Sequence, residues 1–458
     1  MKINDAIEGA ARIAHRLLEE EAKNSTIKFI PENQLREDID ISLNKEGVAE
    51  DHFFELLEKI VLATPRTSGT SFFNQLFAGR SAPALSADML VPVINTTMHT
   101  YKVAGIHTLI EKEVVKEMLK IFGFENGEGI MNEGGSISNL VSLIIARNEL
   151  IPDSQSSGIQ SKRLISYTSE GSHYSVRKNV RLLGLGSENI RFIPSDENGK
   201  MDILELESTI KKDLKNGYIP FYLNATSGTT VLGAYDPITE LAAICKKYQI
   251  WLHIDGALGA SAIFSKKHSH LMKGVELADS ITWNAHKMLN VPVLASFFMV
   301  KHKGLLKKHF AEQAGYLFQT EDNGLDLGNQ SIQCGRRVNG FKVWATLKYF
   351  GLKGIEKRID KIFGLAQYAM NVINGHPDMQ LIAEPISTNI CFNIKGVDPV
   401  SLCDFLHVQG LAVVGYSEVK GLKFVRMSIV NPEIEEKDLD NFFDIVLEAA
   451  KHLENQLF

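Results

Sequence analysis

The eight residues Ser-Ile-Thr-Trp-Asn-Ala-His-Lys, at positions 280–287, decide how the rest of the chain is interpreted. They begin like a β-strand and end on a lysine, Lys287. Upstream, the apolar run Ile-Trp-Leu-His-Ile at 250–254 also predicts a strand, and Asp255 follows it directly. Ligands of α/β proteins bind outside the carboxyl ends of the strands. We therefore expect Lys287 and Asp255 to face one site.

A lysine and a carboxylate at one site suit pyridoxal phosphate. This cofactor needs a lysine amine to form a Schiff base with its aldehyde, and a carboxylate to keep its ring nitrogen protonated. Trp283 and His286 should desolvate the Lys287 amine, which lowers its pKa and makes it a better nucleophile. Taken alone, Lys287 is better explained as a solvated lysine and Asp255 as a turn residue. Their shared position after a strand favours the cofactor site.

Composition indicates a soluble intracellular protein. The 458 residues are 44% hydrophobic and 23% charged, and a formal charge of −6 gives no overall attraction to nucleic acid or anionic membrane. The first 24 residues mix acids and bases, and no apolar run reaches about eighteen residues, so we expect neither signal peptide nor membrane span. The cysteines are far apart, which predicts reduced thiols in the cytoplasm: Cys245, Cys334, Cys391 and Cys403.

The pattern along the chain predicts an α/β domain between two smaller parts. Strand-like runs at 163–167, 190–193 and 221–224 alternate with helical stretches at 137–149, 203–216 and 238–248. Such alternation indicates crossover connections and a largely parallel sheet. The first twenty residues or so predict an amphipathic helix, which suits packing on its own domain as well as a dimer contact. The chain divides into residues 1–95, 96–343 and 344–458, the last with the helices and strands of an α+β domain.

Three further segments offer residues for the cofactor. The Gly-Gly-Ser-Ile-Ser-Asn stretch at 134–139 precedes a helix, where it either cradles a phosphate or forms only a turn and a helix cap. His173 follows a strand and either stacks on the cofactor ring and passes protons, or is a structural histidine. Thr226 and Ser227 end another strand, where their hydroxyls reach Asp255 or the ring, or serve a turn. A metal site is also suggested by His253 with Asp255 and by His268 with His270, but no third and fourth ligand lie at convincing spacing, so we expect no metal.

Several segments, in order, resemble the group II pyridoxal phosphate-dependent amino acid decarboxylases, in the branch with glutamate, aspartate and cysteine sulfinate decarboxylases. They are Phe-Phe-Asn-Gln-Leu at 72–76, the 134–139 stretch, Ser-His-Tyr-Ser at 172–175, Asn-Ala-Thr-Ser-Gly-Thr-Thr at 224–230, Gly-Tyr-Leu-Phe-Gln at 315–319 and Ile-Gln-Cys-Gly-Arg-Arg at 332–337. The resemblance extends through most of the chain. An ordered set of this kind is far more specific than any one motif.

The resemblance implies the fold type I architecture of pyridoxal phosphate enzymes. A large, mostly parallel sheet has helices on both faces and carries the cofactor, a small α+β domain follows, and the N-terminal helical segment contributes to a homodimer with the cofactor at the interface. The implied catalytic residues are Lys287 (Schiff base), Asp255 (ring nitrogen) and His173 (ring stacking). The implied cofactor-binding residues are these three with Gly135, Ser136, Thr226, Ala257, Asn284 and His286, and the implied substrate-binding residues are Gln75 and Arg426.

The sequence departs from the family's usual pattern at several positions. Ala285 stands for a proline, and Gly256 and Leu258 stand for alanine and tryptophan, which predicts an altered pocket with cofactor binding retained. The loop at 320–329 is short and lacks the tyrosine that protonates the substrate carbanion in relatives. Either His173 or water then supplies that proton, or misprotonation at the cofactor carbon yields an aldehyde or a transaminated cofactor. Lys102 stands for a glutamate and is either a determinant for an acidic substrate or a solvated lysine.

These residues predict an enzyme that decarboxylates a small acidic L-amino acid, namely glutamate, aspartate or cysteine sulfinate, to the amine and carbon dioxide. Two alternatives remain open. One is a decarboxylating aldehyde synthase or another carbon-carbon lyase, which the missing tyrosine permits. The other is a dimer that binds pyridoxal phosphate with little catalysis.

Overall fold

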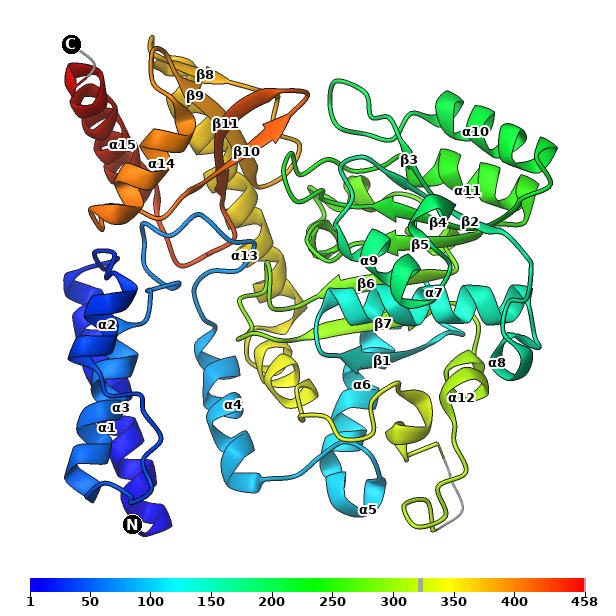
Figure 1. Ribbon diagram of the computed structural model, residues 1–458, viewed down its shortest axis with the longest axis horizontal. Helices are drawn as coiled ribbons and strands as arrows, with labels where there is room; N and C mark the ends of the chain where they lie inside the picture. The colour runs from blue at the N-terminus through cyan, green and yellow to red at the C-terminus, as the bar shows by residue number, and fades with distance from the viewer. Residues whose placement is uncertain (320–323, 457–458) are drawn as a thin grey trace.

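The computed structural model describes residues 1–319 and 324–456 of the chain. Two β-sheets organise it, one of seven strands in the middle of the chain and one of four strands near its carboxyl end (Figure 1). Part of the short loop that the sequence singled out, residues 320–323, lies outside the described residues. Among the described helices, none combines the length and the apolar character that a membrane crossing requires.

The large sheet is mostly parallel, as the sequence predicted. Its strands are β1 (Glu128–Asn132), β2 (Leu164–Ser169), β3 (Ile190–Ile193), β4 (Ile219–Thr226), β5 (Trp251–Asp255), β6 (Ser280–Asn284) and β7 (Ser296–Val300). Their order across the sheet is β1-β7-β6-β5-β4-β2-β3. The run from β6 to β3 is parallel, whereas β7 is antiparallel to both β1 and β6.

Helices cover both faces of this sheet, and alternate residues of β2 show the two layers. Ile165 and Tyr167 belong to a core with residues of α6 (Ile106–Ile121), α10 (Ile203–Lys215) and α11 (Ile238–Tyr248). Leu164 belongs to another core with residues of α7 (Gly135–Leu150) and α9 (Ser175–Leu182). Burial on both faces explains why the strand sequences are almost continuously apolar.

The small sheet and the remaining helices flank this α/β layer. The small sheet is antiparallel, in the order β10-β11-β9-β8, and comprises β8 (Met379–Leu381), β9 (Asn389–Ile394), β10 (Gly415–Val419) and β11 (Leu422–Ser428). The helices are α1 (Ile3–Lys23), α2 (Glu32–Asp38), α3 (Glu50–Ala63), α4 (Ala82–Ile94), α5 (Tyr101–Ala104), α8 (Ser154–Ser157), α12 (Leu305–Phe310), α13 (Gly340–Gly375), α14 (Pro399–Val408) and α15 (Glu436–Gln456). Helix α13 bends at Gly351, whose φ is +62°, and runs across the expected boundary at residue 343. The three-part division stays a prediction.

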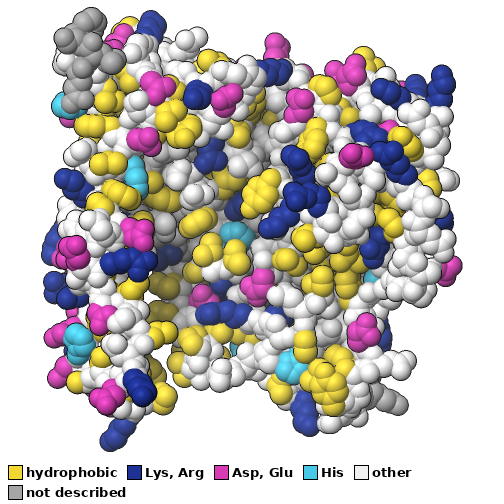
Figure 2. Space-filling view, viewed as in Figure 1, with side chains coloured by type: hydrophobic (Ala, Val, Ile, Leu, Met, Phe, Trp, Pro, Cys, Tyr) yellow, Lys and Arg dark blue, Asp and Glu magenta, His cyan; other side chains and the backbone are white. Residues whose placement is uncertain are grey.

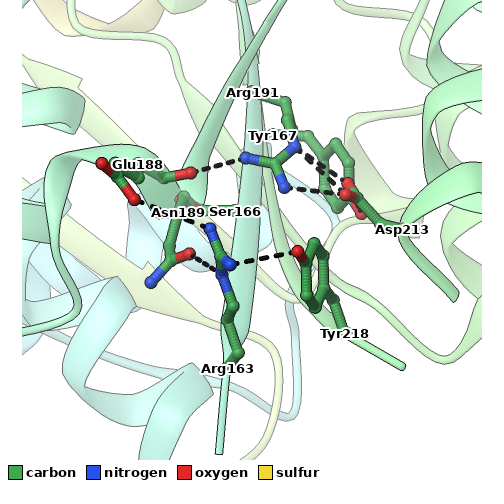
Figure 3. A network of polar contacts seen from close by, with 8 residues as sticks. All are labelled: Arg163, Ser166, Tyr167, Glu188, Asn189, Arg191, Asp213 and Tyr218. Atoms are coloured by element: carbon green, nitrogen blue, oxygen red, sulfur yellow. Dashed lines mark hydrogen bonds and ion pairs between the residues drawn. The ribbon is translucent and has the colours of Figure 1, made fainter. Parts of the chain in front are cut away.

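Asp213 on α10 holds the outer edge of the large sheet through a polar network (Figure 3). Its carboxylate accepts hydrogen bonds from the Arg191 guanidinium on β3, at 2.7 Å, and from the Tyr167 hydroxyl on β2, at 3.0 Å. Asp213 is only 3% exposed. Burial, and then the Asp213 charge, raise the pKa of Tyr167, so that its hydroxyl stays a donor. The network therefore ties α10 to two neighbouring strands.

We expect Asp213→Ala to lower the free energy of unfolding by about 3 kcal/mol, because it leaves a partly buried guanidinium without its carboxylate. Urea denaturation followed by circular dichroism measures this change. Glu113→Ala is the control, since Glu113 pairs with Lys116 at 3.2 Å in an exposed ion pair. That control should change the free energy by less than about 0.5 kcal/mol. Equal losses in the two variants would contradict the structural role of Asp213.

Candidate active site

A cavity of about 470 Å³ lies where β4, β5 and β6 end and α7 begins. Nine residues that the sequence nominated for the catalytic and cofactor-binding roles line it together: Gly135, Ser136, His173, Thr226, Asp255, Ala257, Asn284, His286 and Lys287. The carboxyl ends of parallel strands meet at one edge of a sheet, which is why positions far apart in sequence converge here.

Lys287 and Asp255 lie at the ends of adjacent strands. Lys287 follows β6 in a turn, where its backbone N–H donates to the Asn284 carbonyl at 3.3 Å. Burial lowers the pKa of the Lys287 amine, and the nearby Asp255 charge opposes that shift. A lowered pKa leaves more of the amine in its nucleophilic neutral form.

The Asp255 carboxylate is buried, at 4% exposure, and held by two donors. Its Oδ1 accepts the Ala257 backbone N–H at 3.2 Å, and its Oδ2 accepts the Asn139 side-chain amide at 2.8 Å. Hydrogen bonds to an ionised carboxylate stabilise its charge and fix its orientation. Asp255 is therefore a fixed, buried acceptor at the cavity wall.

The first turn of α7 forms another wall of the cavity. Gly134, before the helix, has φ +92°, a conformation that favours glycine. A Cβ on Gly135 would lie 3.0 Å from Asn284 Nδ2, so a side chain there would crowd the wall. The backbone N–H groups at a helix start have no partner within the helix and carry its positive dipole end. This end of the cavity suits a phosphate group.

Two histidines also belong to the polar lining. His173 Nδ1 accepts the Ser175 backbone N–H at 3.2 Å, and burial lowers the pKa of its ring, which Asp255 opposes. His286 lies between Asn284 and Lys287 in sequence, and its Nδ1 lies 2.9 Å from the Ala295 carbonyl oxygen. Burial lowers the pKa of His286 to about 4. Both rings are therefore neutral near pH 7.

The hydroxyls of Thr226 and Ser227 do not bond to Asp255. The Thr226 hydroxyl accepts the Asn224 side-chain amide at 3.3 Å, and Ser227 Oγ is buried without a partner among the described residues. Asn139 makes the side-chain hydrogen bond to Asp255 instead. Helical spacing contained a signal for this residue, because Asn139 lies four positions after Gly135 and thus on the same face of α7.

Gln75 and Arg426 lie outside the residues that line the cavity. Gln75 is exposed, whereas its neighbour Phe77 lines the cavity. Arg426 on β11 is half-buried and donates to the carbonyl oxygen of Thr230, a lining residue, at 3.0 Å, and to the Asn74 carbonyl oxygen. Burial lowers the pKa of Arg426. The substrate roles of Gln75 and Arg426 stay predictions.

The lining fits pyridoxal phosphate in the chemistry of its donors and acceptors. Asn284 Oδ1 is buried without a hydrogen-bond partner among the described residues, and the cavity also holds a desolvated amine and a fixed carboxylate. The start of α7, whose backbone N–H groups suit an anion, lines the same space. Leu258 lines the cavity where the family usually has tryptophan, so the wall is apolar but smaller there.

Comparison with known proteins decides the family. A match to the pyridoxal-dependent decarboxylase conserved domain covers residues 31–395. The chain belongs to this family. The decarboxylase is therefore a carboxy-lyase whose cofactor is pyridoxal phosphate, as the sequence predicted.

The decarboxylase is similar over most of its length to characterised proteins. The acidic amino acid decarboxylase GADL1 of Mus musculus is 36% identical over 438 residues, which cover 90% of this chain and 80% of that protein. The cysteine sulfinic acid decarboxylase of Mus musculus is 34% identical over 432 residues, which cover 89% and 87%. The crystal structure of mouse CSAD superposes with a TM-score of 0.92 at 31% identity and covers 98% of this chain and 99% of that one. The predicted fold class is thereby confirmed.

Proposed function

We propose that this decarboxylase acts on a small acidic L-amino acid, glutamate, aspartate or cysteine sulfinate, and releases carbon dioxide and the corresponding amine. The names of two relatives, an acidic amino acid decarboxylase and a cysteine sulfinic acid decarboxylase, support this substrate class. Convergence of Lys287, Asp255 and His173 on one cavity is the observation that carries the proposed site.

The proposed roles follow from the chemistry of each side chain. Bound pyridoxal phosphate supplies an electron sink for the electron pair left when the carboxylate departs. Lys287 would hold the cofactor covalently, and Asp255 would keep the proton on its ring nitrogen. His173 would contact the ring and offer an exchangeable proton. Gly135 and Ser136 would hold the phosphate, and Ala257 and Thr226 would confine the ring.

Arg426 is proposed to bind a substrate carboxylate. Its hydrogen bonds go to the backbone oxygens of Thr230 and Asn74, and no carboxylate pairs with it among the described residues. A guanidinium offers five N–H donors in a planar fork that matches a carboxylate. The Arg426 guanidinium is thus held in place by backbone oxygens, and its positive charge is free to pair with an anionic group of the substrate.

Arg426→Met is expected to raise KM for acidic substrates by about 10- to 100-fold, because hydrogen bonds to a charged group contribute about 1.5 to 3 kcal/mol each. Initial rates over a range of substrate concentrations give KM. Lys423→Met is the matched control, since Lys423 lies on the same strand and is exposed. A KM for acidic substrates that stays within twofold of wild type would remove Arg426 from the substrate site.

Product identification tests the reaction itself. Purified protein with added pyridoxal phosphate is incubated with each of the twenty amino acids and with cysteine sulfinate, and the products are identified by mass spectrometry. An amine from an acidic substrate is the expected result. An aldehyde would instead show a decarboxylating aldehyde synthase, and absence of any product would support a binding role with little catalysis.

We further propose a homodimer formed through α4. This helix carries exposed apolar side chains, among them Leu90 and Val93, and borders a groove of about 990 Å³ with α13. Figure 2 shows hydrophobic side chains along the hollow between the N-terminal helices and the rest of the molecule. Large exposed apolar surfaces of this kind mark interaction sites. A second copy of the chain is the occupant that the family resemblance implies.

Val93→Asp is expected to weaken the dimer at least about a hundredfold, because a two-fold interface places the introduced charges on both partners. Size-exclusion chromatography with light scattering should then give the mass of one 51.0 kDa chain. Leu204→Asp is the control, since Leu204 is an exposed leucine on α10. Unchanged dimer mass for Val93→Asp at micromolar concentration would exclude α4 from the interface.

A further inference from the structure

A row of polar side chains, buried from Ser280 onward, leads from the start of β5 to the Asp255 carboxylate. Trp251 Nε1 lies 2.9 Å from Ser280 Oγ, and Ser280 Oγ lies 2.9 Å from His253 Nδ1. His253 Nε2 lies 3.1 Å from Asn139 Oδ1, and Asn139 Nδ2 lies 2.8 Å from Asp255 Oδ2. Ser280 and His253 are fully buried, and Asn139 is 2% exposed. Nothing in the proposed catalysis uses the first four of these residues.

The groups at the two ends of the row determine the direction in which its hydrogen bonds are donated. An ionised carboxylate only accepts, so Asn139 turns its Nδ2 toward Asp255 and its Oδ1 toward His253. His253 must then carry its hydrogen on Nε2 and accept from the Ser280 hydroxyl on Nδ1. At the far end the Trp251 indole N–H is a donor only, which leaves Ser280 Oγ as its acceptor. Both ends therefore require that each side chain of the row donates to the next one, in the direction of Asp255.

Asn139 also connects to His173. Its Nδ2 lies 3.2 Å from Ser175 Oγ, which lies 2.8 Å from His173 Nδ1. The Ser175 backbone N–H also donates to His173 Nδ1, so this nitrogen is an acceptor, and the hydrogen of the neutral ring is on Nε2. One amide thus contacts Asp255 directly and His173 through Ser175.

We propose that Asn139 is a positioning residue for both ring-contacting side chains, and that Trp251, Ser280 and His253 fix its orientation. The proposal rests on the proposed cofactor roles of Asp255 and His173. Aligned hydrogen bonds polarise one another and stabilise the negative end of the row, so Asp255 is held as an acceptor for a ring N–H. His173 Nε2–H remains as the exchangeable proton of that ring. Burial lowers the pKa of His253 to about 4, which keeps that ring neutral as the row requires.

The first test measures the histidine tautomers without relying on the cofactor. Protein labelled with ¹⁵N at its histidines, studied by long-range ¹H–¹⁵N correlation NMR near pH 7, reports which ring nitrogen carries hydrogen. His253→Gln and His173→Gln assign the two rings among the 14 histidines. The expected result is the Nε2–H form for both. An Nδ1–H or doubly protonated His253 would overturn the proposed direction of the row.

The second test uses two buried serines that both accept an indole N–H. Ser280→Ala interrupts the row, whereas Ser261→Ala removes the acceptor of Trp283 Nε1, which lies at the same distance of 2.9 Å. The readouts are the affinity of the apoprotein for pyridoxal phosphate and the pH titration of the bound cofactor's visible absorbance. We expect Ser280→Ala to weaken affinity about tenfold and to shift the titration, and Ser261→Ala to leave both at wild-type values.

Asn139→Leu, which keeps the side-chain shape and removes its hydrogen bonds, should have the larger effect, about tenfold or more on affinity and on kcat. The outcomes separate this proposal from the proposed function. A wild-type protein that never shows lysine-bound cofactor absorbance would refute the proposed site itself. A wild-type protein that shows it, with Ser280→Ala equal to Ser261→Ala in both readouts, would refute the positioning role alone.

Discussion

Lys287→Ala is expected to abolish the visible absorbance of lysine-bound pyridoxal phosphate and to reduce kcat by at least about 10⁴-fold, the scale on which loss of a covalent catalytic residue acts. Lys287 is the lysine of the cavity that holds Asp255, His173 and the α7 start. Burial lowers the pKa of its amine, which permits covalent attachment near neutral pH. Absorbance spectra of the purified variant with added cofactor, together with steady-state rates, measure both effects.

Lys342→Met is the control. It tests whether loss of any buried lysine affects cofactor binding, or only loss of the lysine that lines the cavity. Lys342 on α13 is 1% exposed, and burial lowers its pKa as well, but its amine lies 3.5 Å from Asp88 outside the cavity lining. Methionine keeps most of the side-chain volume, so this variant should lose stability and keep the cofactor absorbance. Absorbance that survives in Lys287→Ala would show that another amine binds the cofactor.

The sequence could predict Lys287 and Asp255 together because strand periodicity and family motifs both give their positions. It could not predict the direction of β7. Ser296–Val300 is a fully buried, largely apolar run, and such a run has the same sequence pattern whether it pairs parallel or antiparallel with its neighbours. The stretch that holds Asn139 was interpreted only as a phosphate loop or a helix cap. Its bond to Asp255 joins residues 116 positions apart, a distance over which local pattern carries no information.

The hydrogen-bond partners of His253 could not be predicted from the sequence either. The sequence raised it as a metal candidate with Asp255 and found no further ligands, but it offered no alternative partner. The structure places its ring between Ser280 and Asn139, which come from β6 and α7. The partners of a buried polar group depend on which helix covers which strand, so they become visible only with the tertiary fold. The group that replaces the missing loop tyrosine as proton donor, His173 or water, stays a prediction, and residues 320–323 of that loop lie outside the described residues.

Asp255→Asn is expected to reduce kcat by roughly two to four orders of magnitude, because loss of one partner of a buried charge pair costs about 3 to 5 kcal/mol. An amide cannot neutralise a protonated ring nitrogen, so the ring loses that proton and becomes a weaker electron sink. The two donors that hold the carboxylate, Ala257 N–H and Asn139 Nδ2, would also meet a side chain with half the acceptor capacity. Steady-state rates and the affinity for pyridoxal phosphate measure the loss.

Asp236→Asn is the matched control for this prediction. Asp236 is 3% exposed and accepts backbone N–H groups of Thr226 and Met201 at 2.7 and 2.8 Å, but it does not line the cavity. Burial raises the pKa of Asp236 to about 6, so its carboxylate is already disfavoured in the fold. The amide should therefore alter stability and leave the cofactor absorbance intact. If Asp255→Asn kept kcat within tenfold of wild type, the ring nitrogen would not depend on Asp255, and the row of side chains behind it would have no catalytic purpose.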